Sequence, residues 1–155
     1  MAYFATNKKK DLSVYIDTNV LRNYCTKQTL DYVCLSYVFS VRRREKLFTS
    51  TLAIGQTLSG LQKSRSNKTG LSKEETVEKG HFLLHKITLI DFSEKDVNQS
   101  FLQTGNDVED NIHYVLSQKK DCKIIITNDI KGFRKFDNII VVSPLDMAYL
   151  KKLIS

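Results

Sequence analysis

The sequence predicts a three-layer α/β/α fold with a mainly parallel sheet of about five strands. Short β-branched and aromatic runs alternate along the chain with longer segments of helical periodicity, which is the pattern of parallel α/β proteins. A length of 155 residues with 41% apolar content suits one continuous core. The single proline, Pro144, falls where a helix is expected to begin. Residues 1–155 are therefore predicted to form one domain, with about 1–11 as a polar N-terminal extension.

The five strands are expected at 13–16, 47–49, 87–90, 123–128 and 139–142. Helices are expected from Thr18 onward, over 30–45, 51–63, 73–85 and 93–104, from Asp107 onward, and after Pro144. Ser72 and Glu75 have the spacing of a capping box, and Gly105 is expected to end a helix. In the helix after Asp107, the residues Val108, Ile112 and Val115 are expected to face the core.

The positive charge is concentrated in one part of the chain. The formal net charge is +7, and the segment from 42 to 73 contains eight basic residues against the single acid Glu45. Such a concentration suits a polyphosphate partner such as RNA, although a solvated surface is the alternative interpretation. The candidate RNA-binding residues are Arg42, Arg43, Arg44, Lys63, Arg65 and Lys68.

The cysteines favour a reducing compartment. Cys25, Cys34 and Cys122 are odd in number and have no metal-ligand spacing. No apolar segment is long enough for a signal peptide or a membrane span. A cytoplasmic location without a membrane partner is therefore expected.

Aspartates follow two of the expected strands. Asp17 ends the run 13–16, and Asp129 comes after the run 123–128. Because ligands bind outside the carboxyl ends of strands in open α/β sheets, the two carboxylates are expected on one rim, where they suit a hard divalent cation. Asp110, at a helix start, is the third candidate. Asp107 is interpreted first as the helix cap and second as a further ligand.

Three segments together resemble the PIN domain family: Ile16-Asp17-Thr18-Asn19-Val20-Leu21, Asp107-Val108-Glu109-Asp110 and Ile126-Thr127-Asn128-Asp129. The resemblance covers nearly the whole chain. It implies an acidic pocket at the sheet edge that binds Mg²⁺ or Mn²⁺ and hydrolyses single-stranded RNA. Carried over by position, Asp17, Asp110 and Asp129 are the catalytic and metal-binding carboxylates, with Asn19, Gln56 and Thr127 as supporting polar groups.

The sequence is most similar to small prokaryotic PIN proteins, among them the toxin ribonucleases of toxin–antitoxin pairs. This resemblance implies a metal-dependent endoribonuclease with RNA as substrate, a protein antitoxin as partner, and a homodimer as a further association. In such a reaction the metal activates a bound water, so that no nucleophilic side chain is required.

Two positions depart from the family pattern. Gln56 stands where the family usually has a glutamate, and Gly132 stands where many relatives carry another acid. The alternative function is therefore a catalytically weakened PIN-fold module that binds RNA or protein. An aspartate-nucleophile phosphatase is disfavoured, because that chemistry usually requires an acid at Asn19. His113 is interpreted first as a surface or hydrogen-bonded helix histidine and second as a residue near the pocket. Tyr114 is interpreted first as half-buried helix surface and second as a residue that stacks on a base.

Overall fold

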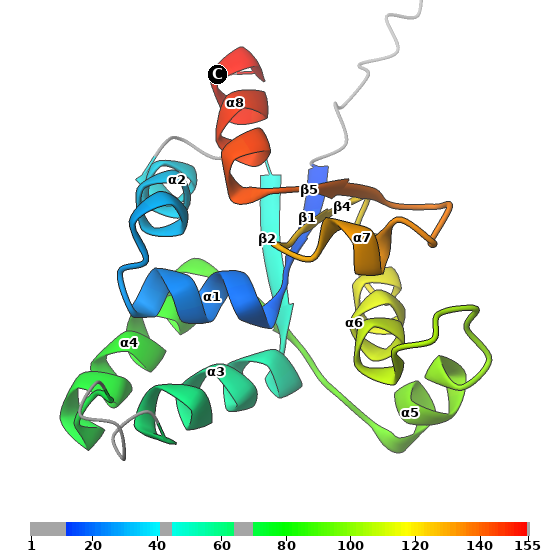
Figure 1. The fold of residues 1–155 in the computed structure, drawn as a ribbon, viewed down its shortest axis with the longest axis horizontal. Coiled ribbons are helices and arrows are strands. Elements are labelled where there is room, and N and C mark those ends of the chain that lie inside the picture. Colours follow the sequence, from blue (N-terminus) through cyan, green and yellow to red (C-terminus); the bar gives the residue numbers. More distant parts are fainter. Residues whose placement is uncertain (1–11, 41–44, 64–69, 155) are drawn as a thin grey trace, which may run out of the picture.

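The computed structural model describes residues 12–40, 45–63 and 70–154. Five parallel strands form one sheet in the order β3-β2-β1-β4-β5 (Figure 1). The strands are β1 (Leu12–Ile16), β2 (Glu45–Ser50), β3 (Thr88–Ile90), β4 (Ile124–Ile126) and β5 (Ile140–Val142). The predicted class, a parallel α/β sheet of five strands, is confirmed.

Eight helices connect or flank these strands in the described part of the chain. They are α1 (Thr18–Cys25), α2 (Thr29–Ser40), α3 (Thr51–Lys63), α4 (Lys73–Lys86), α5 (Glu94–Ser100), α6 (Val108–Gln118), α7 (Ile130–Phe133) and α8 (Pro144–Ile154). The predicted capping box is present at the start of α4: the Ser72 hydroxyl accepts from Glu75 N, and the Glu75 carboxylate accepts from Ser72 N. Pro144 is the first residue of α8, as expected. In this part of the chain, no helix is both long enough and apolar enough to cross a bilayer.

The sheet is buried on both faces because its central strands alternate their side chains between two apolar clusters. Val14 and Ile16 of β1 belong to the cluster covered by α1, α2, α3, α4 and α8, whereas Tyr15 belongs to the cluster that includes residues of α6 and α7. Ile125 of β4 belongs to the same cluster as Tyr15. Full burial of such a side chain contributes about 1.5–3 kcal/mol, so these two clusters hold the three layers together. The two groups of helices lie on opposite sides of the sheet (Figure 1).

The second helix is shorter than the sequence predicted. It is described as far as Ser40, and Glu45, predicted as its last residue, instead begins β2, where it pairs with Leu12 of β1. The Glu45 carboxylate is buried against the ammonium group of Lys151 in α8, which also donates to Val38 O. This tertiary ion pair holds the first residue of β2 against α8, and it was not visible in local periodicity.

The helices on the other face also differ from prediction. α5 ends at Ser100, four residues before the expected end, where the Ser100 hydroxyl donates to Val97 O. In α6, Val115 is buried as expected, but Val108 is exposed and Asn111 is buried. The buried face of α6 therefore includes polar residues such as Asn111 and His113 as well as apolar ones.

Candidate active site

The rim of the sheet at the carboxyl ends of β1 and β4 positions two of the predicted aspartates. β1 and β4 are adjacent and parallel, and Ile16 pairs with Ile126 at the last residue of each strand. Asp17 follows β1 directly, and Asp129 follows β4 after Thr127 and Asn128. The strand register therefore brings both turns to the same edge, as expected for a parallel sheet.

Asp17 is buried and its carboxylate is held by three donors. It is the N-cap of α1, where Oδ1 accepts from Thr18 N at 2.7 Å. Its Oδ2 accepts from Asn19 Nδ2 at 2.8 Å and from Thr127 Oγ1 at 2.7 Å. The structure thus places Asn19 and Thr127, both predicted as supporting polar groups, against this carboxylate.

The same polar residues connect the β1 turn with the β4 turn. Thr127 Oγ1 accepts from Asp129 N at 2.9 Å while donating to Asp17, and Asn19 Oδ1 accepts from Asn128 N at 3.2 Å. The position of Asp17 is therefore fixed by the turns that follow β1 and β4. Charge-assisted bonds of this kind are stronger than neutral ones, which favours a rigid carboxylate.

Asp110 and Asp129 approach each other on one side of Gly132. Asp129 is the N-cap of α7, and its Oδ1 accepts from Gly132 N at 2.9 Å. A Cβ atom on Gly132 would lie 2.4 Å from Asp129 Oδ2 and 2.6 Å from Asp110 Oδ2. Both oxygens consequently lie close to the same side of Gly132. The glycine leaves the space in which the two carboxylates approach, so a larger side chain there requires them to move.

The charge of Asp110 is crowded by its neighbours. Burial raises the pKa of its carboxyl group, and the nearby carboxylates of Asp107 and Asp129 raise it further. The Lys135 ammonium, 3.4 Å from Asp110 Oδ2, acts in the opposite direction. Asp107 caps α6 by accepting from Glu109 N at 2.8 Å and Asp110 N at 3.3 Å, which agrees with its interpretation as a helix cap.

Gln56 reaches the rim but does not contact Asp17. Its Oε1 accepts from Thr18 Oγ1 at 2.9 Å, and its Nε2 donates to Glu109 Oε1 at 3.0 Å. The sequence did not single out Glu109. Gln56 of α3 therefore contributes to the edge of the site through its hydrogen bonds with Thr18 and Glu109.

His113 is a buried helix histidine with polar partners beside the site, which agrees with two of its interpretations and not with the surface one. Its side chain is 1% exposed, its Nδ1 lies 2.8 Å from the Tyr15 hydroxyl, and its Nε2 lies 3.9 Å from both Asp17 Oδ1 and Glu109 Oε1. The i,i+4 spacing of Glu109 and His113 is the sequence signal that these two side chains lie close together on one face of the helix. Tyr114 is half-buried and stacks on Phe136 with ring centroids 4.0 Å apart, as expected for helix surface.

A hard divalent cation fits this rim through the chemistry of its donors. Asp110 and Asp129 present paired carboxylate oxygens, and their mutual repulsion is relieved by a positive charge. Within the described residues, however, no three acidic, histidine or cysteine side chains are already gathered around one point. Convergence of Asp17 with Asp110 and Asp129 on a single ion therefore stays a prediction.

The predicted RNA-binding residues fall mostly outside the described part of the chain. Arg42, Arg43, Arg44, Arg65 and Lys68 are all outside it, whereas Lys63 is exposed at the end of α3. The proposed basic surface is therefore represented here by Lys63 alone among those candidates.

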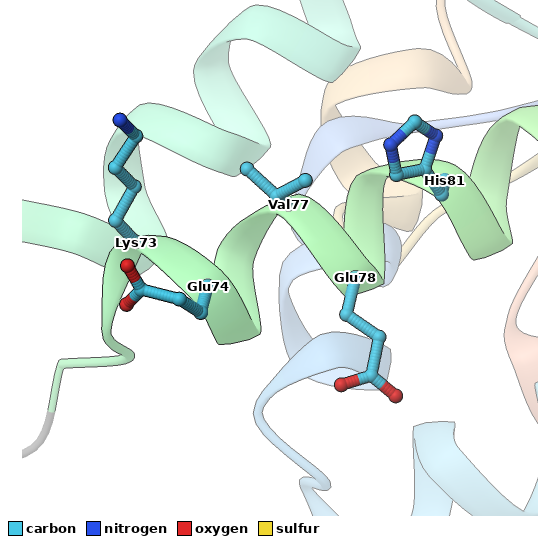
Figure 2. Close-up of a pocket in the computed structure, with 5 residues that line it drawn as sticks. All are labelled: Lys73, Glu74, Val77, Glu78 and His81. Atoms are coloured by element: carbon cyan, nitrogen blue, oxygen red, sulfur yellow. The ribbon is translucent and has the colours of Figure 1, made fainter.

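An open groove of about 490 Å³ lies along α4, away from the rim. It is lined by Lys73, Glu74, Val77, Glu78 and His81, and Figure 2 shows these side chains projecting from this one helix. None of the predicted site residues lines it, so the groove does not extend the candidate active site.

The chain belongs to the PIN domain family, whose model matches residues 14–139. No curated protein sequence matches significantly. Among solved structures, VapBC2 from Rickettsia felis, bound to a DNA fragment from its promoter, matches with a TM-score of 0.61 at 20% identity. That match covers 85% of this chain and 98% of the other.

Two further structures show the same fold. VapBC-1 from nontypeable Haemophilus influenzae matches with a TM-score of 0.62 at 12% identity, covering 86% of this chain and 99% of the other. Mycobacterium tuberculosis VapC20, described as a sarcin–ricin loop cleaving toxin, matches with a TM-score of 0.58 at 13% identity, covering 79% and 98%. The family resemblance and the fold expected from the sequence are both confirmed.

Proposed function

We propose that this protein is a Mg²⁺- or Mn²⁺-dependent endoribonuclease and the toxin of a toxin–antitoxin pair. The observation that carries the proposal is the approach of Asp110 and Asp129 beside Gly132, on the rim that also carries Asp17. Membership of the PIN family and the fold shared with VapC20 support it. RNA is the proposed substrate, the cytoplasm the proposed location, and an antitoxin protein and a second copy of the chain the proposed partners.

Asp17, Asp110 and Asp129 would hold the divalent ion. When bound, that ion would lower the pKa of a coordinated water and stabilise the charge that develops on the phosphate. The chain's own residues prepare the site. Asn19 and Thr127 fix the Asp17 carboxylate, and Gly132 leaves room for Asp110 and Asp129 to face each other. No side-chain nucleophile is required.

A cleavage assay with single-stranded RNA across Mg²⁺, Mn²⁺ and EDTA tests this proposal. We expect cleavage that requires metal and that disappears in Asp129→Asn, because one of the two facing carboxylates is then neutral. Asp137→Asn is the matched control, since this exposed aspartate follows α7 outside the site. Metal-independent cleavage, or undiminished cleavage by Asp129→Asn, would contradict the proposal.

The competing function is an RNA- or protein-binding PIN module that has lost cleavage. Two features favour it: Gln56 carries no charge, and the Lys135 ammonium lies against Asp110. Tight RNA binding without turnover at saturating Mn²⁺ would support this function over the ribonuclease.

A further inference from the structure

The amide of Gln56 connects two parts of the rim that are distant in sequence. Its oxygen accepts from the hydroxyl of Thr18, the residue after Asp17, at 2.9 Å. Its nitrogen donates to the carboxylate of Glu109, the residue before Asp110, at 3.0 Å. An amide can accept and donate at the same time, so Gln56 fixes the Glu109 carboxylate relative to the turn after β1.

The buried ring of His113 gives a second, independent connection. Its Nε2 lies 3.9 Å from Asp17 Oδ1 and 3.9 Å from Glu109 Oε1, and 3.4 Å from Thr18 Oγ1. The Tyr15 hydroxyl holds the other ring nitrogen at 2.8 Å. Asp17 and Glu109 therefore flank the same immobilised imidazole.

Glu109 is a charged group that is open to solvent. Its Oε1 accepts from Gln56 Nε2 at 3.0 Å and lies 3.9 Å from His113 Nε2. The side chain is 60% exposed, in contrast to the 1% exposure of His113. The Glu109 carboxylate is therefore held by Gln56 and is open to solvent at the edge of the rim.

We propose that Glu109 is a further acidic positioning residue of this active site, held by Gln56, and that it supplies the negative charge that α3 does not provide at position 56. The proposal rests on the proposed metal-dependent function. Glu109 acts on the cation site through the Gln56, Thr18 and His113 contacts that lead to Asp17. It adds one negative charge to those of Asp17, Asp110 and Asp129.

Exchanging the two side chains tests this role. Calorimetric titration with Mn²⁺ compares the wild type, Glu109→Gln and the double variant Gln56→Glu/Glu109→Gln. We expect Glu109→Gln to weaken Mn²⁺ binding about tenfold, the usual size of an outer-shell effect. The double variant should recover the wild-type affinity, because it retains one carboxylate and one amide in the same pair. Cleavage of RNA should follow the same order.

Glu94→Gln is the matched control, because Glu94 is exposed in the first turn of α5 as Glu109 is in the first turn of α6. It should leave Mn²⁺ affinity unchanged, and thermal unfolding verifies that every variant is folded. Unchanged affinity in Glu109→Gln would overturn the inference. So would a double variant as weak as Glu109→Gln, since that result shows that a carboxylate at position 56 does not replace the one at position 109.

Asp129→Asn separates failure of this inference from failure of the proposed function. If the wild type binds Mn²⁺, Asp129→Asn does not, and Glu109→Gln matches the wild type, only the role of Glu109 is overturned. If the wild type itself binds no Mn²⁺, the proposed function and the inference are both overturned.

Discussion

The carboxylates on the two sides of the rim are held in different ways. On the β1 side, Asp17 accepts hydrogen bonds from Thr18 N, Asn19 and Thr127. On the α6–α7 side, Asp110 approaches Asp129 beside Gly132, and the Lys135 ammonium approaches Asp110 at 3.4 Å. The β1 side is stabilised by protein donors before any ligand binds. The α6–α7 side concentrates negative charge that a cation would neutralise, so the two sides should respond differently to the loss of a carboxylate.

The largest expected effect comes from Asp17→Asn. The asparagine amide retains one acceptor oxygen where the carboxylate has two, so at least one of the three present donors loses its partner. Cleavage should fall to the assay background, and the free energy of unfolding should fall by about 1–2 kcal/mol. Chemical denaturation measures the stability. A metal-free variant as stable as the wild type would show that the hydrogen bonds to Asp17 contribute little.

Asp110→Asn should change the stability of the metal-free protein in the opposite direction. The raised pKa of Asp110 means that its contribution is fully favourable below the ordinary aspartate pKa of about 4 and is lost as the pH rises through the raised value. Neutralising it should therefore stabilise the metal-free protein at pH 7 by about 0.5–1 kcal/mol. The gain should disappear when both proteins are compared in acid. If Asp17→Asn and Asp110→Asn change the free energy of unfolding in the same direction, the two sides of the rim do not differ in this way.

Gly132→Ala separates the metal site from the fold. The added Cβ would meet the ends of two flexible side chains, Asp110 and Asp129, which must move apart. Unfolding free energy should change by less than about 1 kcal/mol, while Mn²⁺ affinity should fall about tenfold. Gly55→Ala is the control, because nothing lies within 4 Å of a Cβ there. Equal Mn²⁺ affinities for the two variants would show that the spacing beside Gly132 is not important.

The smallest expected effect is that of Lys135→Met. Removing the ammonium should raise the pKa of Asp110 further, since Lys135 now lowers it. It should also tighten Mn²⁺ binding by about threefold to tenfold, because a neighbouring positive charge repels the ion. A carboxyl-carbon NMR titration and calorimetry measure the two quantities. Lys131→Met, at an exposed position in α7, should change neither. If both lysine variants behave alike, Lys135 is not a specific partner of Asp110.

The fold could be predicted because its signals are local. The run around Val14 and Ile16, the capping box at Ser72 and the proline at 144 each determine an element without reference to the rest of the chain. The place of Glu45 in a strand could not be predicted in this way. Its carboxylate contacts Lys151, which is 106 residues away in sequence.

The candidate site was only partly visible in the sequence. Asp17 and Asp129 could be placed on one edge because strand ends in a parallel sheet define that edge. Glu109 was not singled out, and the position of His113 near the site was only the second interpretation, since their contacts are with Gln56 and Tyr15 on distant elements. Gly132 was noted as the absence of an acid, whereas its structural role is to leave space between two others. The catalytic assignment of Asp17, Asp110 and Asp129 stays a prediction.

The buried Lys151–Glu45 pair gives the C-terminal helix a role in preparing the protein for experiments. Lys151 is 1% exposed and also donates to Val38 O, so α8 is anchored to both β2 and α2. Shortening the chain before Lys151 would leave the Glu45 carboxylate without its ammonium partner inside the protein. Breaking such a buried pair costs about 3–5 kcal/mol, a large part of the stability of a domain this size. Affinity tags and truncations that preserve the last turns of α8 are therefore the ones expected to yield folded protein.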